Sequence, residues 1–299
     1  MEIYDLGIAW DWPYDADFVA LLEAACHKRG LTVLQVTQDN LSAVTEALAQ
    51  ERLSFSAFFD RAWDANPAFY PLAQEVERRV PRLINPYSQA RWVHDKATMH
   101  LEFLARGIAV PYTLTVAPVE EPWGPSPSAM APLGPSFVLK PALGGGGEGV
   151  VADVQTWQQV LAEQQRLGYD KWLLQEQVRP AILEDRPAWF RVICAAQGIF
   201  PCWWHPATHR YEVLTATDEA RLELGQLRDI ASAIAALAGL DLFSTEIAWT
   251  QAGQFLAVDY VNDPCDMRLQ SRAADGVPDE IVVAVARQLA ELVERRQPT

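Results

Sequence analysis

The chain has 299 residues, of which 50% are hydrophobic and 21% are charged, and its formal net charge is −15 at pH 7. It is longer than one hydrophobic core usually supports, so two or three subdomains are expected. The strong negative charge argues against a large surface for nucleic acid or for an anionic membrane, because both would repel the protein.

The cysteines and the apolar segments predict a cytoplasmic protein with reduced, buried thiols. The cysteines lack the short paired spacing of a zinc site, and a chain of this length does not depend on disulfides. Residues 1–12 are acidic and lack the pattern of a signal peptide, and no apolar run reaches the length of a membrane span. We expect neither a membrane nor a nucleic-acid partner, and the sequence leaves a homodimer open. The cysteines are Cys26, Cys194, Cys202 and Cys265.

Residues 1–95 predict a small α/β domain with a parallel sheet. Asp15 is suited to cap a helix whose apolar stripe contains Phe18, Leu21, Leu22 and Ala25. Extended segments alternate with such helical segments, a pattern that favours parallel strands. The extended segments are residues 3–10, 31–37, 54–60 and 81–85.

The rest of the chain predicts further α+β structure. Residues 117–135 contain eight prolines or glycines and predict a loop. Around it we expect a helix at residues 95–104 and strands at residues 108–116, 136–140, 149–154 and 171–178. A helix at residues 156–167 should end at Gly168. Hairpins are expected at residues 189–204 and 242–261, with a long helix at residues 218–237 between them and a last helix at residues 278–295.

A lysine and a glycine run form the most informative motif. Lys140 ends an extended segment, and Gly144–Gly147 follow it and lead into another extended segment. A Walker-type loop would place the lysine after the glycines and open a helix. The run here therefore predicts the tip of an antiparallel hairpin, whose backbone N–H groups can cover phosphates while Lys140 reaches them from the strand. The alternative is a flexible surface turn, which would not explain the lysine.

Lysine usage is consistent with this interpretation. The chain has four lysines, Lys28, Lys96, Lys140 and Lys171, against twenty arginines. Where arginine is so favoured, a lysine that remains indicates a need for a compact ammonium charge.

The hairpin of residues 242–261 places two carboxylates in register. If its turn centres on Ala252 and Gly253, counting outward puts Glu246 directly opposite Asp259. Facing like charges are destabilising unless a cation lies between them, and Mg²⁺ prefers such oxygen ligands. A metal site is one explanation, and two carboxylates that face solvent are the other.

Three segments, taken together, resemble the ATP-grasp superfamily, in which ATP lies between two α+β subdomains. Residues 95–113 resemble the helix that carries the first ATP-binding lysine, residues 138–150 resemble the lysine strand and glycine flap, and residues 173–178 resemble the adenine hinge. The resemblance covers about residues 95–272. It implies a small N-terminal α/β domain at residues 1–95, then an ATP-grasp fold with a flap subdomain at residues 96–175 and a metal-binding subdomain at residues 176–299.

The resemblance also implies roles for individual residues. ATP and Mg²⁺, with Mn²⁺ as a substitute, are the expected cofactors. Arg191 resembles the arginine that contacts the transferring phosphoryl group, and with Lys140 it is expected to be catalytic. Ribose recognition is assigned to Glu184 or its neighbour Asp185. The nucleotide-binding residues implied are Lys96, Lys140, Gly144, Gly145, Gly146, Gly147, Gln175, Glu176, Val178 and Glu184.

The implied metal ligands are Glu246, Asp259 and Asn262. The superfamily carries acidic ligands at the first two places, thirteen residues apart as here, but its usual ending is Glu, any residue, Asn, whereas this chain reads Asp259-Tyr-Val-Asn262. Residues three apart on a strand face opposite sides. Either a bulge restores Asn262 to the site, or Tyr260 stands where the glutamate should be and the adjacent Asp259 substitutes for it.

Candidate substrate-binding residues lie in two other segments. Arg210 lies near the expected mouth of the site and is suited to bind an anion, whereas the nearby pair His205 and His209 is a weak metal candidate because Pro206 argues against a helix. Asp60 and Arg61 follow a strand at the edge where α/β sheets place ligands. A helix cap and a surface ion pair would explain them equally well.

The resemblance implies an ATP-dependent carboxylate–amine ligase that forms an amide through an acyl phosphate and releases ADP and phosphate. Its partners would be small-molecule carboxylates and amines, such as amino acids or peptides. A small-molecule kinase and a non-catalytic ATP-binding protein are the alternatives, and the sequence does not separate them.

Overall fold

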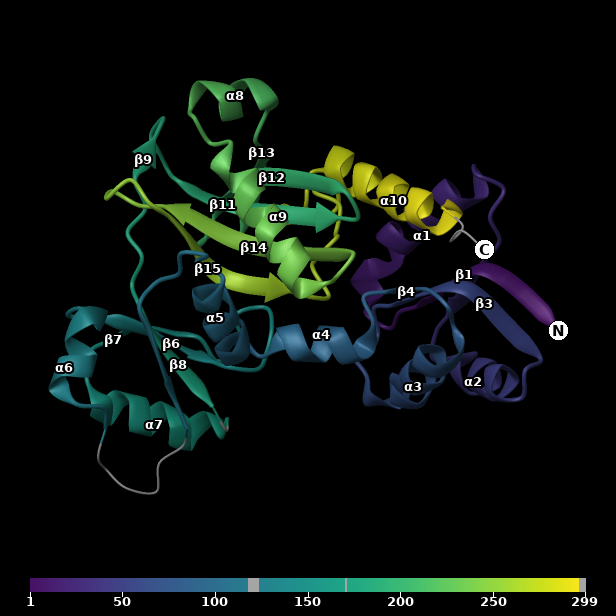
Figure 1. The fold of residues 1–299 in the computed structure, drawn as a ribbon, viewed down its shortest axis with the longest axis horizontal. Helices are drawn as coiled ribbons and strands as arrows, with labels where there is room; N and C mark the ends of the chain where they lie inside the picture. The colour runs from purple at the N-terminus through teal and green to yellow at the C-terminus, as the bar shows by residue number, and fades with distance from the viewer. Residues whose placement is uncertain (118–123, 170, 296–299) are drawn as a thin grey trace.

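The structure is a computed structural model that describes residues 1–117, 124–169 and 171–295. Three larger sheets and a two-stranded hairpin organise this part of the chain, and each larger sheet has its own helices (Figure 1). The α/β and α+β class that the sequence predicts is confirmed. All four cysteines are free and buried.

The first sheet has the strand order β2-β1-β3-β4, and all its pairs are parallel. Successive residues of β1 and β3 contact different cores: Ile8 and Phe59 face α1 and α10, whereas Ala9 and Phe58 face α2 and α3. Helices on both faces explain why these strands are apolar throughout. The elements are β1 Glu2–Ala9, α1 Ala16–His27, β2 Val33–Val36, α2 Leu41–Ala49, β3 Leu53–Asp60, α3 Tyr70–Arg79, β4 Leu83–Ile84 and α4 Tyr87–His94, with 3₁₀ turns Pro13–Asp15 and Pro67–Phe69.

The second sheet has the order β5-β8-β6-β7 and is antiparallel. Helix α7 begins after the capping box of Thr156 and Gln159 and ends at Gly168, which has a φ of 70°, as the sequence predicts. Strand β8 ends one residue beyond the proposed subdomain boundary. The elements are α5 Lys96–Ala105, β5 Thr113–Val116, α6 Pro127–Met130, β6 Phe137–Pro141, β7 Val151–Val154, α7 Trp157–Leu167 and β8 Trp172–Glu176, with a 3₁₀ turn Ala131–Leu133.

Part of the predicted loop at residues 117–135 is helical. Ser126 caps α6 by accepting a hydrogen bond from the Ala129 N–H, and Pro127 occupies the first helical position, where proline is favoured. The prediction of a loop is therefore wrong for residues 127–133. Residues 118–123 lie outside the described part of the chain.

The third sheet has the antiparallel order β13-β12-β11-β14-β15. The single long helix predicted at residues 218–237 is wrong, because the chain forms α8 and α9 with a break at Glu223, whose φ of 57° is incompatible with a helix. The elements are β9 Ile182–Leu183, β10 Arg186–Pro187, β11 Trp189–Ala195, β12 Gly198–His205, β13 Arg210–Val213, α8 Ala216–Arg221, α9 Gln226–Ala238, β14 Leu242–Trp249, β15 Phe255–Asn262 and α10 Asp279–Glu294.

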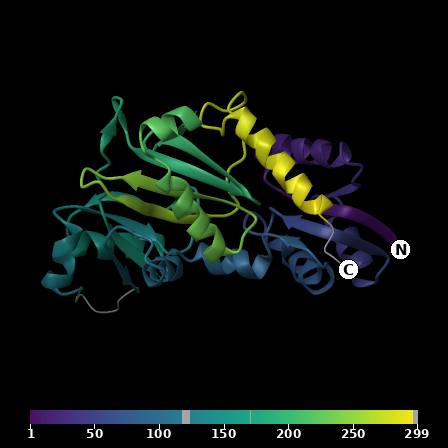
Figure 2. The same cartoon turned by 45° about the horizontal axis from the view of Figure 1, so that its top comes forward.

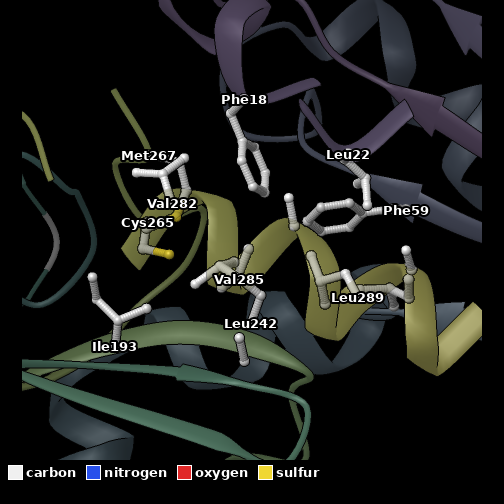
Figure 3. Close-up of a cluster of buried hydrophobic side chains, with 14 of the residues drawn as sticks. Phe18, Leu22, Phe59, Ile193, Leu242, Cys265, Met267, Val282, Val285 and Leu289 are labelled. Atoms are coloured by element: carbon white, nitrogen blue, oxygen red, sulfur yellow. The ribbon is translucent and has the colours of Figure 1, made fainter. Parts of the chain in front are cut away.

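Helix α10 joins the first and third sheets through one hydrophobic core. It lies alongside α1 and also contacts β11 and β12 (Figure 2). Figure 3 shows Phe18, Leu22 and Phe59 on one side of α10, with Ile193 and Leu242 on the other. Most of the second sheet packs in a separate core around Trp172 and Leu139, whereas Leu173 of β8 and helix α5 belong to the cluster of the third sheet. The first and third sheets are therefore packed together, while the second sheet is a more independent layer.

Candidate functional site

A cavity of about 720 Å³ is bordered by all three units of the fold. Its walls come from the segments after β1 and β3, from the start of α5, from β6 and the glycine run, and from β11, β12, β14 and β15. Of the predicted site residues, it contains Arg61, Lys96, Lys140, Gly144, Gly145, Gly146, Gly147, Arg191, Glu246, Asp259 and Asn262.

Lys96 is positioned by the N-terminus of α5. The Asp95 carboxylate caps this helix by accepting hydrogen bonds from the N–H groups of Ala97 (3.0 Å) and Thr98 (3.3 Å). The backbone N–H of Lys96 donates to the Ala142 carbonyl (2.8 Å), and its ammonium group donates to the carbonyl of Gly144. The two predicted ATP-binding motifs are thus in direct contact.

The glycine run turns back on itself at the tip of the β6–β7 hairpin, as the sequence predicts. Gly144, Gly146 and Gly147 have positive φ values of 120°, 61° and 76°, which other residues rarely adopt. A side chain built on any of the four glycines Gly144–Gly147 would meet open space, so at Gly144, Gly146 and Gly147 conformation rather than crowding requires glycine. Among the described residues, none accepts a hydrogen bond from the N–H groups of residues 145–147, which are free to bind an anion.

Lys140 extends from β6 toward the third sheet. Its ammonium group donates to the Val258 carbonyl at 3.3 Å. Burial lowers the pKa of Lys140, while the carboxylates of Asp259 and Glu246 act in the opposite direction and favour the charged form. The second lysine therefore lies beside the predicted acidic pair.

Glu246 lies directly opposite Asp259, as predicted, although the turn differs from the one used to count the register. Trp249 pairs with Phe255, which leaves a longer turn, and a register shift between Glu246 and Ile247 compensates for it. Glu246 also pairs with Arg191 (Nη2 to Oε1, 3.3 Å).

Arg191 and Trp189 both contact Glu246 from β11. The Trp189 indole N–H donates to Glu246 Oε2 at 3.1 Å, so this tryptophan contacts the predicted metal ligand. Burial alone would raise the pKa of Asp259, but Lys96, Lys140 and Arg191 together hold it below its ordinary value. The site thus contains three cations around two carboxylates.

The last residues of β15 differ in where they place Asn262 and Tyr260. A second register shift places Asn262 opposite Ser244, and the Asn262 side chain lines the cavity. Tyr260 is buried in the core, where its hydroxyl contacts His100 Nδ1 at 2.8 Å and Gln175 at 3.3 Å. The geometry therefore matches the bulge alternative rather than a site built on Tyr260.

Six predicted site residues do not line the cavity: Gln175, Glu176, Val178, Glu184, Arg210 and Asp60. The Gln175 side chain is buried against Tyr260, and the Glu176 carboxylate accepts from the Tyr112 N–H at 2.8 Å. Val178, in the loop after β8, is half-buried. The expected ribose contact at Glu184 is not supported, because Glu184 and Asp185 have positive φ values in the β9–β10 turn, where the Glu184 carboxylate pairs with Arg221 at the surface. Arg210 begins β13 and is exposed, so its expected substrate contact is not supported either.

Asp60 and Arg61 interact within the protein. Asp60 accepts from the N–H groups of Ala62 (2.9 Å) and Trp63 (3.1 Å) and does not line the cavity. Arg61 reaches the cavity wall but donates to the Asp15 carboxylate at 2.8 and 2.6 Å. Asp15 consequently makes no side-chain cap for α1, and the predicted surface ion pair is a buried one.

The buried carboxyls of Asp60 and Asp263 should make the protein less stable as the pH rises. Burial raises the pKa of each carboxyl to about 7, although hydrogen bonds from Ala62 and Trp63 partly offset this at Asp60. Between about pH 4 and pH 7 the folded state therefore holds protons that the unfolded state has released. We expect the free energy of unfolding to decrease over this range, and Asp60→Asn to make the decrease smaller.

Urea unfolding at several pH values between 4 and 8 measures this effect. Asp218→Asn is the control, because Asp218 is not buried and the hydrogen bond from Arg221 lowers its pKa. A pH dependence that is unchanged by Asp60→Asn would contradict the assignment.

Much of the opposite end of the cavity was not predicted from the sequence. Arg268 lies there, held by Asp266 (2.7 Å) and Asp275 (2.9 Å), and its guanidinium is 5.8 Å from the centre of the Trp12 ring. Trp204 stacks on His209, with 5.4 Å between ring centres. Arg268 and its two acidic partners follow β15, and His209 lies in the turn after β12, where no local pattern indicates which way a side chain faces.

A metal role for His205 and His209 gains no support. His205 ends β12 and His209 follows in a turn, so they do not share a helix. Within residues 1–117, 124–169 and 171–295, no group of three or more His, Cys, Asp or Glu side chains is arranged to hold a metal ion. Over the same residues, no helix is both long and apolar enough to span a membrane.

Comparison with solved structures identifies the fold. The sequence matches no protein-family model and no curated protein. A RimK domain ATP-grasp protein from Sphaerobacter thermophilus aligns with a TM-score of 0.64 and 22% identity over 96% of this chain and 98% of that one. D-alanine–D-alanine ligase from Bacillus anthracis complexed with ATP aligns at 0.65 and 11%, over 99% and 97%. The ATP-grasp ligase PsnB complexed with a minimal precursor, Mg and ADP aligns at 0.65 and 15%, over 98% of both chains. The chain therefore has the ATP-grasp fold, as its lysine and glycine motifs had indicated.

Proposed function

We propose that this protein is an ATP-dependent carboxylate–amine ligase. The observation that carries the proposal is the single cavity that contains Lys96, Lys140, Arg191 and the facing carboxylates of Glu246 and Asp259. The similar structures include ligases, one complexed with ATP and one with Mg and ADP, which is consistent with this interpretation.

The residues present fit a nucleotide and a divalent cation. The Nε of Arg191 is buried without a hydrogen-bond partner among the described residues, and the guanidinium lies 4.8 Å from the centre of the Trp204 ring. A buried donor without a partner is costly unless a ligand pairs with it. We assign Lys96, Lys140 and the N–H groups of residues 145–147 to the phosphates, and Glu246, Asp259 and Asn262 to Mg²⁺, for which Mn²⁺ is a suitable substitute.

The chain's own contribution to the reaction is position and charge. ATP, when bound, supplies the phosphoryl group that converts a substrate carboxylate into an acyl phosphate, from which an amine displaces phosphate. Arg191 is placed to neutralise oxygens of the transferring group, and Lys140 holds positive charge on a rigid strand. The glycine run covers the site and limits access of water, which would hydrolyse the activated acid. The acid and the amine are proposed to be small molecules or peptides.

Product analysis tests the proposal. The protein is incubated with ATP, Mg²⁺ and pooled amino acids and short peptides, and ADP release and product masses are measured. We expect ADP release that requires both an acid and an amine, and a product heavier by the amine less water. Lys140→Met should reduce turnover by about 100-fold or more, whereas Lys28→Met, at an exposed lysine, should not.

Two outcomes would contradict the ligase assignment. Phosphate transferred to an alcohol, with no dependence on an amine, would indicate a kinase. Tight ATP binding without ADP formation across the whole panel would indicate a non-catalytic nucleotide-binding protein.

A further inference from the structure

His94 contacts the glycine run at its first residue. It is the last residue of α4, and its Nε2 accepts a hydrogen bond from the backbone N–H of Gly144 at 3.1 Å. Lys96 donates to the carbonyl of the same glycine. Gly144 is therefore held on both its amide and its carbonyl by residues two apart in the sequence.

The adjacent residue Asp95 secures the same junction. Its carboxylate pairs with the ammonium group of Lys171 at 2.7 Å, and the Lys171 carbonyl accepts from the Ala142 N–H at 2.9 Å. The run His94-Asp95-Lys96 thus attaches the α4–α5 junction to the chain just after β6, where the glycine run begins, and to the chain just before the neighbouring strand β8.

The surroundings of His94 favour the neutral ring that this contact needs. A ring nitrogen accepts a hydrogen bond only when it carries no proton, so the proton of the neutral ring belongs on Nδ1. Burial lowers the pKa of His94 and nearby Lys96 lowers it further, although the Asp263 backbone and the carboxylates of Asp259 and Asp95 partly oppose this. The Trp63 ring meets the imidazole edge to face, with 5.5 Å between centres, and helps to fix its plane.

The glycines beyond Gly144 are held less firmly. The N–H groups of residues 145–147 have no acceptor among the described residues, whereas the Glu148 N–H donates back to Gly145 at 3.1 Å within the turn itself. The position of the free N–H groups therefore depends on how firmly Gly144 is anchored.

We propose that His94 is a positioning residue that anchors the Gly144 N–H and thereby orients the glycine run for nucleotide phosphates. The anchoring contact stands on the structure alone, while its consequence for phosphates rests on the proposed function. His94 itself does not line the cavity and acts through Gly144.

Two variants at His94 separate the acceptor from the shape of the ring. His94→Leu removes the acceptor, and His94→Gln restores an acceptor oxygen close to the position of Nε2. His94→Asn, whose shorter side chain does not reach as far, replaces the leucine variant if that variant fails to fold. His27→Leu, at an exposed histidine on α1, is the matched control.

Amide hydrogen exchange of Gly144, followed by NMR without nucleotide, tests the contact directly. We expect exchange about 5- to 10-fold faster in His94→Leu, the factor that one hydrogen bond of ordinary strength provides. His94→Gln and His27→Leu should remain within about twofold of the parent protein. Unchanged exchange in His94→Leu would overturn the proposal whether or not the protein uses ATP.

Steady-state kinetics then test the consequence. The Michaelis constant for ATP should rise about 5- to 10-fold in His94→Leu, with kcat changed less than about threefold, and His94→Gln should restore it. An equal loss in both variants, or faster exchange without a change in the Michaelis constant, would overturn the positioning role. If the parent protein forms no ADP, the proposed function fails, while the exchange measurement still decides whether His94 anchors Gly144.

Discussion

Replacing Arg191 by lysine is expected to lower kcat for ADP formation by about 10³-fold, the scale on which an arginine stabilises a phosphoryl-transfer transition state. Arg191 is half-buried in the cavity wall, where it pairs with Glu246 and lies over Trp204. Lysine keeps the charge but loses the planar group that can contact several oxygens at once. The affinity for ATP should change much less than kcat, because the effect is specific to the transition state.

Arg186 offers a matched control for this variant. Its guanidinium lies 4.6 Å from the centre of the Trp203 ring, and its Nη1 is 2.6 Å from Glu212 Oε2. Unlike Arg191, it does not line the cavity. Arg186→Lys should therefore leave kcat within about threefold, because surface ion pairs contribute little. If Arg191→Lys retained kcat within tenfold of the parent protein, the assigned role would be wrong.

Arg61→Ala is expected to destabilise the fold by about 3–5 kcal/mol. The side chains of Arg61 and Asp15 are 2% and 1% exposed and form a two-point ion pair, and Arg61 also donates to the Cys265 carbonyl at 3.0 Å. Removing the guanidinium leaves the Asp15 carboxylate buried without its partner. Urea unfolding of the two proteins at pH 7 measures the difference.

A double variant distinguishes the net contribution of the Arg61–Asp15 ion pair to stability from the cost of leaving one buried charge without its partner. Replacing both Arg61 and Asp15 by leucine removes both charges, so it should cost less than Arg61→Ala alone. Arg106→Ala, which breaks an exposed pair with Glu102, should cost less than about 1 kcal/mol. If Arg61→Ala lowered the free energy of unfolding by less than about 1 kcal/mol, the buried ion pair would not stabilise the fold as we expect.

Patterns that depend on local chemistry predicted much of this site. The lysine strand, the glycine hairpin and the helix that begins near Asp95 are each specified by neighbouring residues, and all appear as expected. The pairing of Glu246 with Asp259 was also predicted, but from a turn that is one residue too short. The irregularity at Val258 returns the register to the expected pair, and the Val258 carbonyl is the one that Lys140 contacts.

Features that depend on tertiary contacts were not predictable in the same way. Asp15 carries every local signal of a helix cap, yet Arg61 lies 46 positions away and binds its carboxylate. Glu184 was expected to contact ribose and Arg210 to contact substrate, but the geometry of the adjacent turns directs both side chains to the surface. Which side chains line the cavity depends on how the three sheets and their helices pack together. Patterns in the sequence contain little information about that packing.

The shared core around α10 has a consequence for how substrates enter. Because one continuous hydrophobic cluster spans the first and third sheets, separating them would expose many buried side chains. The strands of the second sheet pack mostly in a core of their own and contribute Leu173 to the cluster of the third sheet. Opening is therefore expected to be a swing of the second sheet away from the other two, about the α4–α5 junction. The part of the cavity wall that contains Lys140 and the glycine run would move with the second sheet. The part that contains Trp12 and Trp204 would stay in place.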